Sequence, residues 1–315
     1  MSPEQVNRPL PVGFRLGHYR IKRQIASGGF SIVYLAYDAN DMPVAIKEFL
    51  PHSLALRVAD SPEPLIDAVH RATFNEGLRC FFEEGRSLAL LDHPNVVRVF
   101  NFFRANGTAY LVMAYERGRT LRQHIKRHSG PVTETFLRNM FIHLLNGLRE
   151  VHGHKLLHLD IKPANVFLRS DGMPVLLDFG AARQIIGRDQ PQPQAIHTPG
   201  FAASEQYNGR TDLGPWTDIY GVGASIYFCL AGASPQAADL RARKDDLIPA
   251  AQRWKGQYSA NLLQTIDLCM RLDLLERPQS VFSLQRKLSH PQAELLSPAG
   301  LLNSLRRKLG ALLSK

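Results

Sequence analysis

Residues 158–165 read His-Leu-Asp-Ile-Lys-Pro-Ala-Asn, and residues 178–180 read Asp-Phe-Gly. Two short apolar runs lie between them, Val166–Leu168 and Val175–Leu177, separated by the turn-forming pair Asp171-Gly172. This pattern predicts a β-hairpin, which the first motif precedes and the second closes. Each motif is a modest signal by itself, so its meaning depends on the segments around it.

The residues before position 114 alternate between strand-like runs and tight turns. β-branched and aromatic residues dominate five runs, of which the last two are joined by Asn106-Gly107, a type I′ hairpin signal. Residues 74–91 carry apolar side chains at helical spacing, and the proline-containing residues 51–64 predict a loop insertion or an irregular helix. We predict a five-stranded antiparallel unit with one long helix, the strands being Tyr19–Ile25, Ile32–Tyr37, Val44–Phe49, Val96–Phe103 and Ala109–Ala114.

The pattern becomes mainly helical after Gly118. Val132–His152 is a long amphipathic segment, and helical patterns dominate from Trp216 onward, which makes the chain an α+β protein. The most apolar stretch, Ile219–Ala233, is shorter than the about 20 residues of a membrane span and contains three glycines. We expect a buried core helix there, and no signal peptide in the proline-rich N-terminus.

Composition excludes several protein classes. Of 315 residues, 44% are hydrophobic and 21% charged, a profile that argues against a disordered or collagen-like chain. Three cysteines without a CxxC pair exclude a disulfide scaffold and a cysteine zinc site, and they fit a reducing cytosol. Lys and Arg exceed Asp and Glu by 38 − 28 = +10, which leaves nucleic acid, an anionic membrane or phosphate-bearing ligands open.

Two further motifs lie on the predicted strands. Residues 26–33, Ala-Ser-Gly-Gly-Phe-Ser-Ile-Val, connect two strands, and glycine lets backbone N–H groups approach phosphates without a Cβ in the way. Lys47 lies on the next strand, 14 residues after Val33. Alone, these would be read as an ordinary hairpin and a solvated lysine.

The order and spacing of the four motifs resemble the protein kinase superfamily, in particular the bacterial eukaryotic-like Ser/Thr protein kinases. The resemblance covers about residues 18–288. It implies a two-lobed protein kinase fold, with a five-stranded antiparallel N-lobe containing one long helix and a mainly helical C-lobe. We expect an extension at 1–17, the N-lobe at 18–113, a hinge at 114–118, the C-lobe at 119–290, and a basic amphipathic tail at 291–315.

The resemblance also assigns catalytic roles. Lys47 would hold the α- and β-phosphates of ATP, oriented by Glu84, which is preferred over Glu83 because it lies nine residues before His93. Asp160 would accept or orient the substrate hydroxyl proton, and Lys162 would neutralise the γ-phosphate. Asn165 and Asp178 would bind Mg²⁺ or Mn²⁺ through oxygen.

The implied ATP site combines the glycine loop, a hinge and two apolar surfaces around the adenine ring. Met113 fits the gatekeeper position, and the backbone of 114–116 would bond adenine. Only Gly28 matches the three usual loop glycines, although Ala26 and Ser31 are small enough for the loop to close. The full set is Ala26, Ser27, Gly28, Gly29, Phe30, Ser31, Val33, Ala45, Lys47, Met113, Ala114, Tyr115, Glu116 and Phe167.

Other positions carry structural or regulatory expectations. Glu205 should pair with Arg277 as a buried ion pair. Asp218 should accept hydrogen bonds from the backbone of the catalytic loop, residues 158–165. Leu159 stands where many regulated kinases have an arginine that binds an activation-loop phosphate, and residues 181–197 contain no Ser, Thr or Tyr. We therefore expect activity that is independent of activation-loop phosphorylation, with Thr198 bonded to Asp160 and Lys162.

The predicted function is a protein Ser/Thr kinase that uses ATP; the alternative is a pseudokinase-like binding scaffold. Protein substrates are expected, and no separate module supports nucleic-acid binding. Residues 48–57 are similar to bacterial kinases associated with type VI secretion or with partner phosphatases, which makes such proteins candidate partners. Residues 299–315 place leucines on one helical face beside basic residues, which suits either an anionic membrane surface or packing on the same chain. The expected location is the cytoplasm. The alternative is a peripheral location at the inner face of the membrane.

Overall fold

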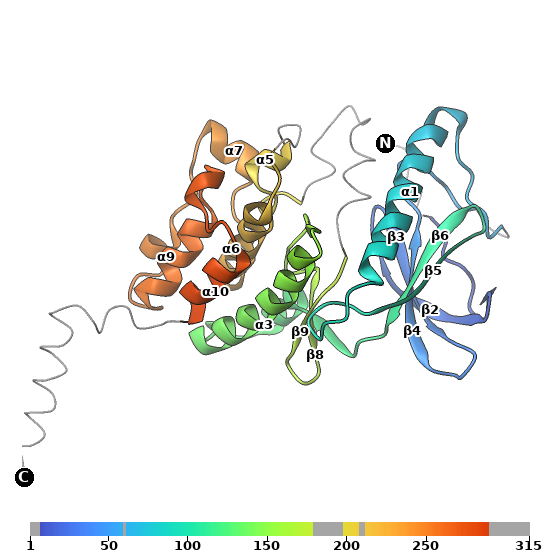
Figure 1. Cartoon of the computed structure of the whole chain (residues 1–315), viewed down its shortest axis with the longest axis horizontal. Helices are drawn as coiled ribbons and strands as arrows, with labels where there is room; N and C mark the ends of the chain where they lie inside the picture. Colours follow the sequence, from blue (N-terminus) through green and yellow to red (C-terminus); the bar gives the residue numbers. More distant parts are fainter. Residues whose placement is uncertain (1–6, 59–60, 179–197, 208–211, 290–315) are drawn as a thin grey trace, which may run out of the picture.

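The structure is a computed structural model that describes residues 7–58, 61–178, 198–207 and 212–289. It has two parts (Figure 1). An antiparallel sheet with the long helix α1 (Arg71–Leu88) forms the N-terminal part, and helices with a small sheet form the C-terminal part. The predicted α+β architecture is therefore confirmed.

The N-terminal sheet has six strands, so the predicted count of five was wrong by one. The order is β1-β2-β3-β4-β6-β5, and all neighbours are antiparallel. The additional strand β1 has two residues, too few to show any alternation of polar and apolar side chains. The strands are β1 (Arg15–Leu16), β2 (Tyr19–Ser27), β3 (Ser31–Tyr37), β4 (Pro43–Phe49), β5 (Val99–Ala105) and β6 (Thr108–Ala114).

Helix α1 packs closely on this sheet. Its buried face includes Phe74, Phe81 and Leu88, and a Cβ added at Gly85 would lie 2.9 Å from Leu111 Cδ1 of β6. The glycine thus sets how near the helix can approach. At the β5–β6 turn, Asn106 and Gly107 both have positive φ, 48° and 66°, which confirms the predicted type I′ turn.

The opposite face of the sheet carries a buried polar network. Lys47 and Glu48 are neighbours on β4 and therefore point to opposite faces. The Glu48 carboxylate accepts hydrogen bonds from Tyr34 Oη at 2.7 Å and Tyr110 Oη at 2.6 Å, and it forms an ion pair with Arg57. Both partners of this ion pair are at most 2% exposed. The network therefore fastens the segment that follows β4 to the back of the sheet.

That segment, residues 50–58, is called the strap below. Leu50 N–H donates to Phe30 O at 3.0 Å and His52 N–H to Gly29 O at 2.9 Å, so the strap holds the turn of the glycine loop. Asn7 in turn holds the strap, donating from Nδ2 to Ala55 O at 3.0 Å. Residues 50–58 are therefore an ordered part of the N-terminal unit, as are residues 7–10.

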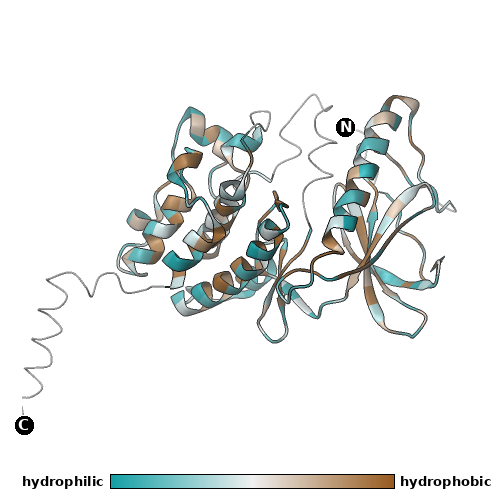
Figure 2. Ribbon diagram, viewed as in Figure 1, coloured by the Kyte–Doolittle hydropathy of each residue, from teal (hydrophilic) through white to brown (hydrophobic). Residues whose placement is uncertain are grey.

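The C-terminal part is built around α6 (Pro215–Ala231), which is buried along most of its length. This confirms the predicted core helix, and no helix in the described part of the chain is long and apolar enough to cross a membrane. In Figure 2 the surrounding helices change between teal and brown along their length, as amphipathic helices around a core do. They are α2 (Leu121–Arg127), α3 (Glu134–Gly153), α5 (Ser204–Tyr207), α7 (Ala238–Arg243), α8 (Ala250–Arg253), α9 (Ala260–Cys269) and α10 (Val281–Ser289).

A three-stranded sheet lies at the junction of the two parts. Its strands are β7 (Gly118–Thr120), β8 (Val166–Arg169) and β9 (Pro174–Leu176), in that order and antiparallel. The predicted hairpin is confirmed as β8–β9, and it carries Asn165 just before its first strand and Asp178 just after its second. Antiparallel pairing thus brings these two residues to the same end of the hairpin.

Candidate active site

Asp160 is surrounded by three polar side chains. Lys162 Nζ lies 2.8 Å from Oδ2 of Asp160, and Asn165 Nδ2 donates to the same oxygen at 2.8 Å. Thr198 Oγ1 donates to Asp160 Oδ1 at 3.1 Å and accepts from Lys162 Nζ at 2.6 Å. The expected bonds of Thr198 to Asp160 and Lys162 are confirmed. These contacts hold the Asp160 carboxylate in one orientation within the catalytic loop.

Asp218, on the buried helix α6, fixes the backbone of that loop. Its carboxylate accepts from His158 N at 2.9 Å and from Leu159 N at 2.7 Å, as expected from the sequence. Leu159 has φ +61°, a conformation that non-glycine residues rarely adopt. Burial lowers the pKa of His158, whose Nε2 lies 2.8 Å from Leu177 O.

Asn165 and Asp178 offer oxygen atoms suited to a hard cation. The side-chain hydrogen bonds of Asn165 to described residues all use Nδ2, which leaves Oδ1 for a metal. Among those residues no group of three or more His, Cys, Asp or Glu could hold a metal ion by itself. Mg²⁺ is usually held by one or two protein oxygens together with substrate phosphates, and this donor set fits that pattern.

Lys47 lies beside Asp178, not beside Glu84. Its Nζ is 3.0 Å from Asp178 Oδ1 and 5.5 Å from the centre of the Phe81 ring. Within the described ranges, the Lys47–Glu84 ion pair expected from the sequence is not formed. Glu84 is buried on α1, one turn after Phe81, and lines a cavity of about 230 Å³ with Cys80. The role of Glu84 therefore stays a prediction.

The strand register brings the other residues expected around the nucleotide to one face of the sheet. Val33 pairs with Lys47 and Ala45 with Met113, so all four side chains share the face on which Lys47 lies near Phe81 of α1. Ala26 and Ser27 end β2, Ser31 begins β3, and Gly28 N–H donates to Ser31 O at 2.9 Å. Gly29 and Phe30 form the turn between these strands.

The hinge residues Ala114, Tyr115 and Glu116 lead from β6 toward β7. The Glu116 carboxylate accepts two hydrogen bonds from Arg169, at 2.9 and 3.0 Å, so its side chain ties the hinge to β8. The half-buried Phe167, two residues earlier on β8, pairs with Thr120. The Glu116 side chain is therefore occupied by Arg169, and the Ala114 N–H donates to Arg98 O at 2.9 Å.

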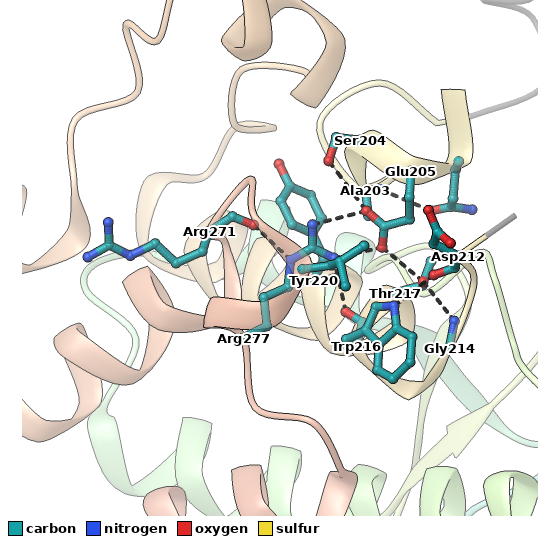
Figure 3. Close-up of polar contacts among 12 residues, drawn as sticks. Ala203, Ser204, Glu205, Asp212, Gly214, Trp216, Thr217, Tyr220, Arg271 and Arg277 are labelled. Atoms are coloured by element: carbon teal, nitrogen blue, oxygen red, sulfur yellow. Dashed lines mark hydrogen bonds and ion pairs between the residues drawn. The ribbon is translucent and has the colours of Figure 1, made fainter. Parts of the chain in front are cut away.

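Glu205 and Arg277 form the predicted buried ion pair (Figure 3). Nη1 and Nη2 of Arg277 reach the two carboxylate oxygens at 2.7 and 3.0 Å, and Thr217 Oγ1 donates to Oε1 at 2.9 Å. Burial would raise the pKa of Glu205, but the hydrogen bonds and charge of Arg277 outweigh it and hold the pKa below its ordinary value. This pair anchors the substrate-side loop, residues 198–205, to the C-terminal helices.

The family model described as "Protein kinase domain" matches residues 19–291. The chain belongs to the protein kinase family. The kinase fold accounts for the arrangement above, because the catalytic loop, the β8–β9 hairpin and the buried α6 stand in the context that the kinase motifs require.

Several known kinases are similar to this chain. Serine/threonine-protein kinase C of Synechocystis is 29% identical over 289 residues, which is 88% of this chain and 50% of that protein. PrkC of Bacillus subtilis is 29% identical over 251 residues, 77% of this chain and 36% of that protein. This kinase chain thus spans about half or less of these relatives. The solved structure titled "PpkA-294 apo form" is 35% identical with a TM-score of 0.82, covering 89% of this chain and 99% of that chain.

Two side chains that contact predicted residues of the kinase site, Phe81 and Arg169, were not among the predicted site residues. Phe81 beside Lys47 could have been found, since it lies three residues before Glu84 and therefore on the same helix face. Arg169 could not, because its partner Glu116 is 53 residues away and neither residue stands in a local pattern that indicates pairing.

Proposed function

We propose that this chain is a protein kinase that transfers the γ-phosphate of ATP to Ser and Thr hydroxyls of protein substrates. The observation that carries the proposal is the set of Lys162, Asn165 and Thr198 around the Asp160 carboxylate, beside the Lys47–Asp178 pair. The names of the relatives, Ser/Thr protein kinases, support the class of acceptor.

Each residue has a distinct role in the proposed reaction. Asp160 accepts or orients the proton of the attacking hydroxyl, and Lys162 offsets negative charge on the transferred phosphoryl group. Lys47 binds the α- and β-phosphates, and the backbone of 114–116 bonds adenine. Asn165 and Asp178 would hold Mg²⁺ or Mn²⁺, which supplies charge neutralisation on the phosphates when bound. Glu84 would orient Lys47 during the reaction, whereas in this structure Lys47 Nζ lies 3.0 Å from Asp178 Oδ1.

The direct test is transfer of labelled γ-phosphate from ATP, with Mg²⁺, to the chain itself and to a general protein acceptor. Phosphoamino-acid analysis should show label on Ser and Thr, and Lys162→Met should remove the label while the circular dichroism spectrum is unchanged. Nucleotide binding without any transfer by the wild-type chain would contradict the proposal and favour the pseudokinase-like scaffold. Label confined to Tyr would contradict the acceptor class.

We also propose that activity needs no phosphate on the activation loop. The side chain of Leu159 has no hydrogen-bond donor for a phosphate, and the Thr198 hydroxyl is bonded to Asp160 and Lys162. Residues 181–197, which contain no Ser, Thr or Tyr, lie outside the described residues.

Treatment of the purified kinase with a broad-specificity phosphatase, followed by removal of the phosphatase, is therefore expected to leave the transfer rate within about twofold. The rate should not change, because the proposed active arrangement contains no charge-assisted hydrogen bond to a loop phosphate that dephosphorylation could remove. The rate is measured at saturating ATP, and mass spectrometry verifies dephosphorylation. A tenfold loss, restored by incubation with ATP, would show that a phosphate is required.

The tail at 299–315 and the partner phosphatase or secretion-system protein stay predictions. The tail lies outside the described residues, so its proposed role rests on the amphipathic pattern of its sequence alone. Co-sedimentation with anionic phosphatidylserine vesicles, compared between the full chain and a chain ending at residue 298, separates a membrane-binding tail from one that packs on its own domain.

A further inference from the structure

The side chain of Gln206 joins two loops of the proposed active site. Gln206 lies on α5, directly after Glu205, and is 4% exposed. Its Oε1 accepts from Ala203 N at 2.9 Å, in the substrate-side loop, and its Nε2 donates to Leu159 O at 2.9 Å, in the catalytic loop. One amide group thus uses its acceptor on one loop and its donor on the other.

The backbone that Gln206 contacts is strained. Leu159 has φ +61°, and for a residue with a Cβ such a conformation is unfavourable and persists only where surrounding contacts enforce it. Two contacts do so: Leu159 N–H donates to Asp218 at 2.7 Å and Leu159 C=O accepts from Gln206. Asp218 alone would fix only the N-terminal side of this residue.

The peptide group fixed by Gln206 is the one that leads into Asp160. The Leu159 carbonyl belongs to the same planar unit as the Asp160 N–H, which lies 3.3 Å from His158 Nδ1. A rotation of this unit would swing the Asp160 carboxylate away from Lys162 and Thr198. The Gln206 bond therefore acts on the orientation of the proposed catalytic base without touching it.

We propose that Gln206 is a positioning residue that locks the catalytic loop to the substrate-side loop and so sets Asp160 in its working orientation without a phosphate. The inference rests on the proposed kinase function. It extends that function by assigning to Gln206 the coupling between the catalytic loop and the substrate-side loop. The apolar side chain of Leu159 has no polar atom with which to make this coupling.

The test uses the full chain and compares Gln206→Leu with Gln285→Leu. Leucine fills a similar volume but makes neither hydrogen bond of Gln206. Gln285 lies on α10, and its Nε2 donates to Asn146 Oδ1 at 2.7 Å and to Ile142 O at 3.3 Å, both on α3. Gln206→Leu is expected to lower kcat roughly 10- to 100-fold, because a small misplacement of a catalytic group has effects of this size, with the KM for ATP within about twofold. Gln285→Leu is expected to keep kcat within about twofold.

A rescue variant separates positioning from general stability. Glycine adopts positive φ without strain, so adding Leu159→Gly to Gln206→Leu should recover at least about tenfold in kcat. A merely structural role of Gln206 predicts no such recovery, because removing the half-buried Leu159 side chain would only remove further packing contacts. Failure of Leu159→Gly to restore kcat, with kcat and melting temperature falling together, would overturn the proposal.

Hydrogen exchange provides a readout that does not depend on catalysis. In Gln206→Leu, the peptides covering 156–165 and 198–205 should exchange faster together, and Gln285→Leu should change neither. Unchanged exchange in both loops with wild-type kcat would also overturn the proposal. If the wild-type chain transferred no phosphate but both loops responded as expected, the proposed function would fail and the positioning role would stand.

Discussion

Asp160→Asn is expected to lower kcat for phosphate transfer by about 10²- to 10⁴-fold, the usual contribution of a positioned acid or base. Asparagine has nearly the same shape and can still accept hydrogen bonds from Thr198 and Lys162, but it cannot take a proton. The KM for ATP should stay within about twofold because the Lys47 and hinge contacts are untouched. Initial rates over a range of ATP concentrations measure both constants.

Asp171→Asn is the matched control for this prediction. Asp171 lies in the exposed turn of the β8–β9 hairpin, where its Oδ1 accepts from Met173 N at 2.9 Å, a bond that asparagine retains. Its kcat should equal that of the wild type. A loss of less than tenfold in Asp160→Asn would remove Asp160 from the role of base.

Arg277→Leu is expected to reduce the free energy of unfolding by about 3–5 kcal/mol, since it leaves the buried Glu205 carboxylate without its cation. Arg277 has a fully buried side chain and also donates to the carbonyls of Arg271 and Leu272. Urea unfolding followed by circular dichroism measures the change.

Arg271→Leu provides the comparison from the same cluster. The Arg271 side chain points away from Glu205 (Figure 3), and its ion pair with Glu276 is exposed at 3.6 Å. Exposed pairs are worth about 0–1 kcal/mol, so this variant should unfold nearly as the wild type does. Equal losses in the two variants would contradict a special role of the Glu205–Arg277 pair.

The same ion pair predicts a pH dependence. The folded-state pKa of Glu205 lies below its ordinary value of 4.5, so the unfolded chain binds the proton more readily. The stability that the pair provides is therefore fully present above about pH 4.5 and is lost as the pH falls through the lower folded-state pKa. The difference in melting temperature between wild type and Arg277→Leu should be constant near neutrality and shrink in acid.

Most of the fold could be predicted because its elements are long and locally patterned. Helix α1, the β8–β9 hairpin and the apolar α6 each carry a complete periodic or turn signal within their own residues. The strands β1 and β7 have two and three residues and could not be recognised, because their pairing depends on neighbours distant in the sequence.

The site could be predicted in its residues more than in its contacts. Asp160, Lys162 and Asn165 stand within one loop, so their proximity follows from the chain itself. The partner of Lys47 depends instead on where α1 lies against the sheet, which is set by packing at Gly85 and Phe81. A family spacing indicates which carboxylate is available, but the structure decides that Asp178 is the one that Lys47 contacts.

The strap has a consequence for where this protein can be shortened. The family match begins at residue 19, yet Asn7 bonds the strap at Ala55 and Arg57, and Leu10 N–H donates to Tyr34 Oη at 3.0 Å. A chain trimmed to the family match would expose the Glu48–Arg57 network from one side and loosen the strap that holds the glycine loop. Contacts that hold the N-terminal part together therefore begin at Asn7, and the boundary of the homology is not the boundary of the fold.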